Sequence, residues 1–268
     1  MKIKIKIPKK RDKKFIVNFF KKKGLKFLVN ESQKKNRSIN QMSLKSPYKP
    51  ELIDLYYLYQ FIILNKRTTI LEFGSGWSSL IFSIALGELK NRYYQNAKKL
   101  RRNNLFELFV LENEKKYLNI SRNRIRKFQK LEKKKQSSKI HYFFSNAEMT
   151  LHNNKISTQY TKLPLCNPDF IYLDGPDQFN IKKDINGIST RHKDMMPMSC
   201  DLLKLEHFFT PGTIIVCDGR AANVKFLKDN FQRNWKYLND KKTDQHIFYL
   251  NDPILGKYNK LQVKFYNN

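Results

Sequence analysis

The residues best placed to do chemistry follow a short apolar segment near residue 70. The run Ile70-Leu71-Glu72-Phe73-Gly74-Ser75-Gly76 places an acid and two glycines between an expected strand and a helix from Ser78. A buried strand seldom ends in Glu unless the charge has a partner. Glycines allow a tight turn and close approach of a ligand, and the first turn of a helix offers free N–H groups. The pattern predicts a ligand site, with a purely structural turn as the alternative.

Acids also end three other expected strands. They lie in the runs Leu111-Glu112-Asn113, Tyr172-Leu173-Asp174-Gly175-Pro176 and Val216-Cys217-Asp218-Gly219. Because parallel strands bring their carboxyl ends to one edge of a sheet, we expect these acids to lie near the glycine turn. Two neighbouring carboxylates could hold a divalent cation, since hard cations prefer oxygen ligands.

Together these motifs resemble class I S-adenosylmethionine-dependent methyltransferases, over about residues 50–250. The resemblance implies that Glu72 and the glycine turn contact the methionine part of the cofactor and that Glu112 binds the ribose hydroxyls. The segment Ser145-Asn146-Ala147-Glu148 follows the third strand, where the family contacts adenine, although an ordinary strand-end turn is the alternative. The implied residues for binding S-adenosyl-L-methionine are Glu72, Gly74, Gly76, Ser78, Glu112, Ala147 and Asp174.

The resemblance also bears on the methyl acceptor. Small-molecule O-methyltransferases of the catechol and caffeoyl type have acids at the places of Asp174 and Asp218, followed by an Asn. Gly219 occupies that Asn position, with Asn223 as a substitute, so a divalent cation is not favoured. The sequence Asp174-Gly-Pro stands where amino-group methyltransferases of nucleic acids carry Asn/Asp-Pro-Pro-Tyr. This favours O-methylation of a small molecule or glycan.

Catalysis at such a site requires a base for the acceptor hydroxyl. Histidine as a residue type can exchange a proton near neutral pH, and His192 lies in a polar loop after the fourth strand, so it is a candidate, with a merely solvated histidine as the alternative. Asp174 and Asp218 complete the predicted catalytic set. Asp177 and Asp194 compete for the role of base.

The net charge of +30 is concentrated in two blocks. Residues 1–37 hold 15 basic and 2 acidic side chains, and residues 90–139 hold 17 and 4. An anionic partner, either a nucleic acid or a membrane surface, is one interpretation, and a solvated lysine-rich surface is the other. A nucleic-acid methyltransferase and a non-enzymatic binding module at an anionic surface are therefore alternative functions. No apolar run reaches the roughly 18–20 residues that span a bilayer. With three unpaired cysteines, the expected location is cytoplasmic, and peripheral membrane association is the alternative.

Short apolar strands alternate with helices along the chain. This order predicts an α/β fold that is Rossmann-like: a mostly parallel, doubly wound sheet with helices on both faces, plus a basic N-terminal extension. We predict two parts, 1–45 as the extension and 46–268 as the methyltransferase-like domain. The basic stretch 90–104 is interpreted as an insertion or a longer helix end. The expected helices are 52–63, 78–89, 115–134, 198–209 and 223–231, and the expected strands are 68–73, 106–111, 140–144, 169–173, 213–217 and 247–250.

Overall fold

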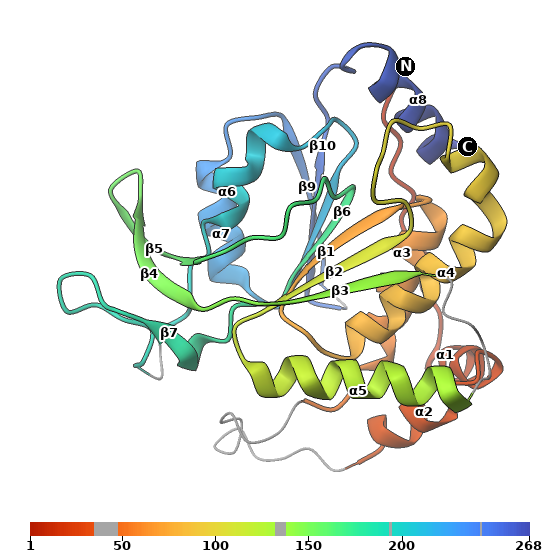
Figure 1. Ribbon diagram of the computed structural model, residues 1–268, viewed down its shortest axis with the longest axis horizontal. Helices are drawn as coiled ribbons and strands as arrows, with labels where there is room; N and C mark the ends of the chain where they lie inside the picture. The colour runs from red at the N-terminus through yellow and green to blue at the C-terminus, as the bar shows by residue number, and fades with distance from the viewer. Residues whose placement is uncertain (35–47, 132–137, 193–194, 242) are drawn as a thin grey trace.

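A seven-stranded sheet forms the centre of the molecule (Figure 1). The computed structural model describes residues 1–34, 48–131, 138–192, 195–241 and 243–268. The strand order is β3-β2-β1-β6-β8-β10-β9; the first five strands pair in parallel, and β10 is antiparallel to both of its neighbours. The bounds are β1 Thr69–Phe73, β2 Glu107–Glu112, β3 Lys139–Phe144, β6 Phe170–Leu173, β8 Ile214–Asp218, β9 Trp235–Asp240 and β10 Gln245–Leu250.

Helices cover both faces of this sheet. Successive strand residues point to opposite faces, so Ile70 belongs to one hydrophobic core and Leu71 to the other. The first core includes α3 (Leu52–Leu64), α4 (Trp77–Ala97) and α5 (Lys115–Leu131), whereas the second includes α6 (Asp201–Leu205) and α7 (Ala221–Asn230). The predicted Rossmann-like, doubly wound α/β fold is confirmed.

A β-hairpin, and not a helix, follows β3. Strands β4 (Ala147–His152) and β5 (Lys155–Tyr160) pair with the short β7 (Ile181–Lys182) in a second sheet of order β5-β4-β7. This small sheet projects from one side of the molecule (Figure 1). Its buried side chains, among them Met149, pack into the second core. The sequence pattern did not predict it.

The described part of the basic N-terminal segment packs against the rest of the chain. Helix α1 (Lys13–Lys22) buries Ile16 and Phe20 in the first core, and α2 (Lys26–Ser32) buries Leu28 and Val29 there. The alternating residues 2–7 form no strand. Instead, the Asn65 side chain accepts a hydrogen bond from the Lys6 N–H and donates one to the Lys6 carbonyl, both at 2.9 Å. The predicted division at residue 45 stays a prediction.

Two expected segments differ in extent from the prediction, and one further helix was not predicted. The helix predicted over 198–209 is the short α6 followed by a 3-10 turn, Glu206–Phe208. Within the stretch 90–104, α4 continues to Ala97. The closing strand is followed by α8 (Gly256–Asn267), whose Tyr266 hydroxyl donates to buried Asp169 at 2.9 Å. No helix in the described ranges is long and apolar enough to cross a membrane.

Candidate functional site

The chain leaves two neighbouring strands in opposite directions at the carboxyl edge of the sheet. After β1 it enters α4 on the first face, and after β6 it continues towards β7 and α6 on the second. Such a switch point opens a crevice in which doubly wound folds bind ligands. The two turns touch here, because a Cβ built on Gly74 would lie 3.1 Å from the Gly175 nitrogen.

Glu72 anchors the glycine turn from inside the protein. Its side chain is fully buried and accepts hydrogen bonds from the Ser78 hydroxyl at 2.5 Å and the Ser79 hydroxyl at 2.6 Å. Burial raises the pKa of Glu72 to about 8, although the two hydroxyls oppose that rise. Glu72 therefore holds the start of α4 against the end of β1.

The two glycines of the turn have different surroundings. Gly74 has φ +94° and its position faces the backbone of Asp174 and Gly175, so it serves the packing of two turns. A Cβ on Gly76 would meet only the Ser78 Oγ, at 3.6 Å. Space for close approach of a ligand therefore lies beside Gly76.

Glu112 reaches the same turn from the end of β2. Its buried carboxylate accepts hydrogen bonds from the Ser75 hydroxyl at 2.7 Å and the Glu114 N–H at 3.0 Å. Burial raises the pKa of Glu112 to about 7. The basic stretch before β2 thus does not displace Glu112 from the glycine turn.

The loop after β6 is tied to the end of β2. Asn113 accepts a hydrogen bond from the Asp177 N–H at 2.8 Å and donates to the Asp177 carbonyl at 3.3 Å. The Asp177 Oδ2 is buried without a hydrogen-bond partner. Asp177 thereby adds an unsatisfied acceptor to the Glu112 side of the crevice.

A cavity of about 560 Å³ lies beside the ends of β6 and β8. Helix α3, the start of α4 and the turn between β9 and β10 complete its wall. The described residues that line it are Tyr48, Lys49, Pro50, Glu51, Asp54, Leu55, Leu58, Trp77, Ser78, Tyr172, Asp174, Asp218, Gly219, Arg220, Lys241, Thr243 and Asp244.

The two predicted catalytic aspartates both line this cavity. The Asp174 side chain is exposed to the cavity. Desolvation of its carboxyl group by the surrounding protein raises the pKa of Asp174 above its usual range, and the negative charge of Asp218 adds to that rise. Asp218 is half-buried and accepts a hydrogen bond from the Tyr172 hydroxyl at 2.7 Å. Burial also raises the pKa of Asp218. Both groups are thus poised to hold a proton nearer to neutral pH than ordinary aspartates are.

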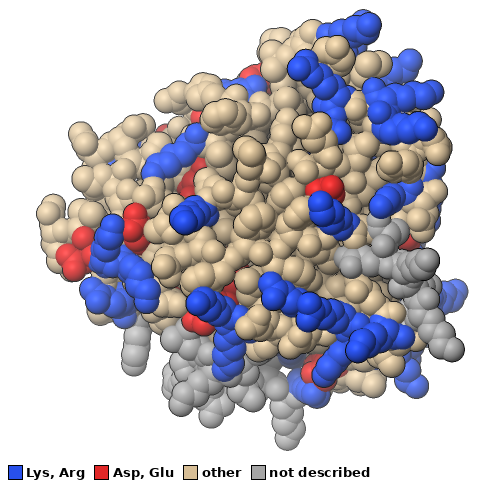
Figure 2. Space-filling view, viewed as in Figure 1, with Lys and Arg blue, Asp and Glu red and all other residues tan. Residues whose placement is uncertain are grey.

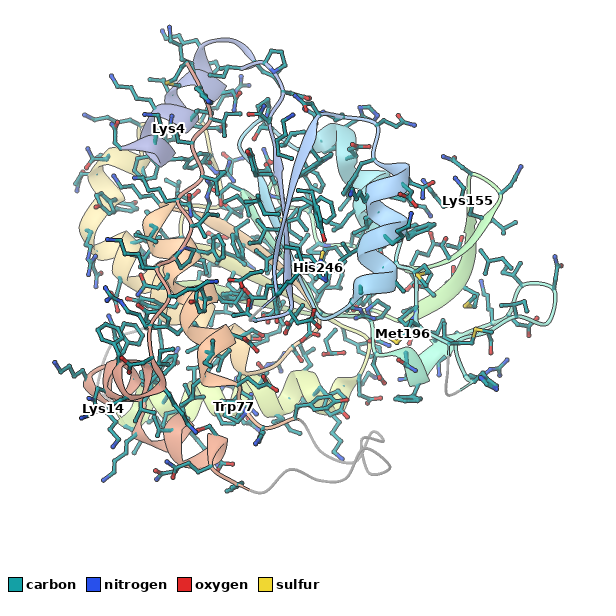
Figure 3. All side chains as sticks on the ribbon, turned by 180° about the vertical axis from the view of Figure 1, so that it is seen from behind. Lys4, Lys14, Trp77, Lys155, Met196 and His246 are labelled. Atoms are coloured by element: carbon teal, nitrogen blue, oxygen red, sulfur yellow. The ribbon has the colours of Figure 1, made fainter. Side chains whose placement is uncertain are left out.

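Other predicted residues that the structure describes do not line this cavity, and their roles stay predictions. His192 is exposed in the loop after β7 and does not line the cavity. The chain at Met196 lies on the lobe that carries Lys155, apart from Trp77 (Figure 3). Ala147 is fully buried at the start of β4. Asp194 lies outside the described residues.

Asn223, the suggested substitute for the family's Asn, is used structurally. Its side-chain amide accepts from the Ser199 N–H at 3.0 Å and donates to the Ser199 carbonyl at 3.3 Å. Within the described part of the chain, no group of three or more His, Cys, Asp or Glu residues could hold a metal ion.

Several residues of the cavity were not predicted from the sequence. Asp54 is the sole charged residue in the apolar helix α3, which is a signal that could have identified it. Thr243 and Asp244 lie in the turn between β9 and β10. The sequence pattern did not show that this turn lines the cavity, because its position depends on the pairing of β10 in the sheet. Arg220 is buried and donates a hydrogen bond to the Pro176 carbonyl at 3.0 Å, which braces the loop after β6.

No protein-family model and no curated protein matches the chain. Among solved structures it is similar to a Staphylococcus aureus protein provisionally named a caffeoyl-CoA O-methyltransferase, with TM-score 0.42 and 10% identity over 89% of this chain and 98% of that one. A methyltransferase from Geobacter sulfurreducens gives TM-score 0.38 and 5% identity over 91% and 93% of the two chains. Human methyltransferase-like protein 13 in complex with SAH gives 0.31 and 11% over 80% and 86%. Likeness at this level carries no argument about function, which must come from the site itself.

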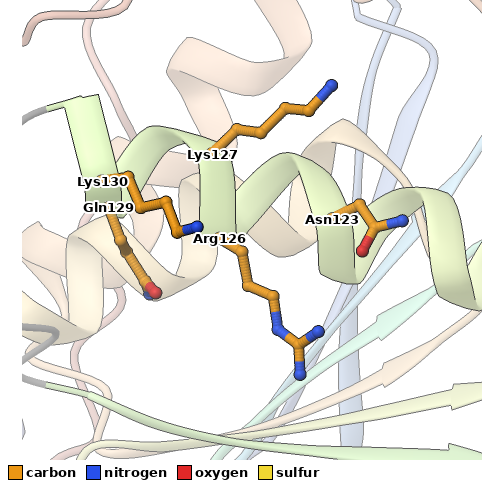
Figure 4. Close-up of a pocket in the computed structure, with 5 residues that line it drawn as sticks. All are labelled: Asn123, Arg126, Lys127, Gln129 and Lys130. Carbon is orange, nitrogen blue, oxygen red and sulfur yellow. The ribbon is translucent and has the colours of Figure 1, made fainter.

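A separate hollow lies on the outer surface of α5 (Figure 4). The described residues that line it are polar or basic: Asn123, Arg126, Lys127, Gln129 and Lys130. On the face shown in Figure 2, Lys and Arg side chains are numerous along α5. The part of the second basic block that lies on α5 is therefore at the surface, outside the crevice.

Proposed function

We propose that this chain is an S-adenosylmethionine-dependent methyltransferase that acts on an oxygen atom of a small molecule or glycan. One observation carries the proposal: the open side of the glycine turn, the Glu112 carboxylate and the cavity of Asp174 and Asp218 meet at one switch point. The crevice thus offers separate places for a cofactor and an acceptor.

The residues of the turn fit this cofactor. A ligand can approach the backbone beside Gly76, and the Glu112 carboxylate has about four lone-pair sites, of which Ser75 and Glu114 use two. The unsatisfied Asp177 Oδ2 is a further acceptor. Glu112 would hold the ribose hydroxyls, and the turn around Gly76 the methionine part. When bound, the cofactor supplies a methyl group on a positively charged sulfur, which an oxygen nucleophile can attack.

The chain's own contribution to the reaction would be positioning and proton removal. Asp174 and Asp218 line the cavity in which an acceptor hydroxyl would lie. A general base works best when its pKa is near the operating pH, and the pKa values of both carboxyls are raised in that direction. The Tyr172 hydroxyl orients Asp218 through its hydrogen bond. Either aspartate would accept the hydroxyl proton as the new bond forms.

The test combines calorimetry with S-adenosylmethionine and a screen for transfer of labelled methyl to sugars, small alcohols and RNA. We expect Asp218→Asn to lower transfer by about 10²- to 10⁴-fold, the usual size of a general-base contribution, or Asp174→Asn to do so if that residue is the base. Asp184→Asn, at an exposed position after β7, should have no effect and serves as the control. Absence of cofactor binding would replace the proposal with the non-enzymatic binding module.

The reaction is proposed to proceed without a divalent cation. Gly219 follows Asp218 where an Asn ligand is expected, and the amide of Asn223 is engaged by Ser199. Transfer should therefore survive exhaustive chelation. Activity that disappears on chelation and returns with magnesium would make the paired aspartates metal ligands.

The basic surface of α5 favours a second candidate, methylation of a nucleic acid. Arg126, Lys127 and Lys130 surround its hollow, and Arg124 on the same helix lies 3.6 Å from the Trp77 ring centre, beside the cavity. Binding through phosphates should weaken steeply with salt, with a log–log slope of about −0.9 per neutralised phosphate for duplex DNA. Nucleic-acid binding that does not weaken as the salt concentration rises would contradict this second candidate function.

A further inference from the structure

The cavity carries the opposite charge balance to the rest of the chain. The whole sequence has 53 basic and 23 acidic residues. The described residues that line the cavity include five acids and only three basic residues: Glu51, Asp54, Asp174, Asp218 and Asp244 against Lys49, Arg220 and Lys241. The general surplus of lysine therefore does not extend to the described lining of this cavity, which has more acidic than basic side chains.

The charge of Arg220 partly offsets the rise in the pKa of Asp174 and of Asp218, but Arg220 forms no ion pair with either carboxyl. Arg220 directs its Nη2 to the Pro176 carbonyl, and its Nε is buried without a partner. Among the ion pairs of the described residues, none joins Asp54, Asp174 or Asp218 to a lysine or arginine. Among the described residues, Asp54, Asp174 and Asp218 thus share this cavity without a direct ion pair to a lysine or arginine.

Burial and the neighbouring negative charges raise the pKa values of these carboxyls. Burial, then the charges of Asp218 and Glu51, raise the pKa of Asp54 to about 8. Asp218 likewise raises the pKa of Asp174, and Asp244 contributes to the rise at Asp54 and at Asp218. A cation placed among these carboxylates would relieve the repulsion and favour their charged forms.

Two other features of the wall suit a positively charged nitrogen. The aromatic residues Tyr48, Trp77 and Tyr172 line the same cavity, and an ammonium group is attracted to aromatic ring faces as well as to carboxylates. The Arg124 guanidinium, 3.6 Å from the Trp77 ring centre, already makes such a contact at the edge of this wall. Thr243 is buried, lines the cavity and has an Oγ1 without a hydrogen-bond partner. That oxygen can accept a hydrogen bond from an N–H of a ligand.

We propose that the methyl acceptor carries a positively charged amine, held by Asp54 and Asp218 against the aromatic wall, so that the substrate is an amino alcohol or amino sugar. The inference rests on the proposed function and narrows its substrate class. Asp54, on α3, would bind the charged amine, which leaves Asp174 near the hydroxyl to be methylated. An analogue of the acceptor without the positive charge would lack the electrostatic attraction to Asp54 and Asp218 and would bind more weakly.

The test uses two probes of the same shape and different charge, choline and 3,3-dimethylbutan-1-ol, with ethanolamine and ethylene glycol as a second pair. Binding is followed by saturation-transfer NMR on the full chain at pH 7.5. We expect the cations to bind at least 10-fold more tightly than their neutral partners. Asp54→Asn should remove that preference. Asp229→Asn, at an exposed position on α7, should keep it.

The outcomes separate this inference from the proposed function. Asp54→Asn resembles the protonated form, so the variant should fold, and its melting curve and affinity for S-adenosylmethionine should match the parent's. Equal binding of charged and neutral probes, or an unchanged preference in Asp54→Asn, would overturn the inference and leave the methyltransferase proposal intact. Displacement of the amines by magnesium would instead assign the cavity to a metal ion. Amine binding without cofactor binding would support the inference and contradict the proposed function.

Discussion

Gly74 and Gly175 lie backbone against backbone where β1 and β6 end. A Cβ built on Gly175 would lie 2.6 Å from the Gly74 nitrogen and 2.7 Å from the Tyr160 hydroxyl. The loops that leave the two strands for opposite faces of the sheet thus meet without side chains between them. This contact sets the width of the crevice in which we place the cofactor.

The first prediction concerns this contact. Gly175→Ala should destabilise the protein by about 2–3 kcal/mol, because the backbone of Gly74 cannot move aside as a flexible side chain would. For a chain of this size, that corresponds to a drop of roughly 5–10 °C in Tm. Gly76→Ala is the matched control, since its Cβ would meet only the Ser78 Oγ at 3.6 Å. Equal melting temperatures for the two variants would contradict the close contact.

The second prediction separates folding from binding at the same turn. Gly76→Val should melt close to the parent, because its φ of −163° is extended backbone and the space beside it is open. It should nevertheless weaken S-adenosylmethionine binding by about 10-fold or more, because the branched side chain fills the space for ligand approach. Calorimetry measures the affinity. An unchanged dissociation constant would move the cofactor away from Gly76.

The third prediction concerns Glu112. Glu112→Ala should weaken cofactor binding by about 1.5–3 kcal/mol, the usual size of hydrogen bonds to a charged group. Glu107→Ala, at the other end of β2, removes an acid that contacts Asn104 and His141 and should leave the affinity unchanged. If both variants bind equally well, the ribose is held elsewhere.

The fourth prediction concerns stability against pH. The pKa of buried Glu72 is about 8 in the folded chain and about 4.3 in an unfolded one, so the unfolded state releases its proton first as pH rises. Stability from this group is complete below pH 4 and declines as pH rises to about 8, by up to a few kcal/mol. Denaturant unfolding at pH 5.5 and pH 8.5 measures the decline. Glu72→Gln should flatten it, and an equally steep profile in that variant would assign the effect to other groups.

The ends of β1, β2, β6 and β8 were predictable from the sequence because these four strands are buried along nearly their whole length. Continuous apolar runs such as Ile214–Cys217 can only lie inside a covered sheet, and the acids that end them must then reach its edge. Glu72, Glu112, Asp174 and Asp218 were located in this way. The hairpin of β4 and β5 was not, because strands with one exposed face and polar neighbours carry a weak pattern. The position of His192 relative to the cavity could not be predicted either, because a loop residue belongs to no periodic pattern that would fix its place in the fold.

By itself, the sequence determined the order of the elements, the α/β class and the positions of acids and glycines at the strand ends, because these depend on local patterns of burial. Only the tertiary structure determined which residues line the same cavity. Asp54 and Asp218 are 164 positions apart in the chain, and the packing of α3 beside β8 and the β9–β10 turn brings them to one cavity. The local excess of negative charge follows from that packing, and no local pattern in a chain of net charge +30 predicts it.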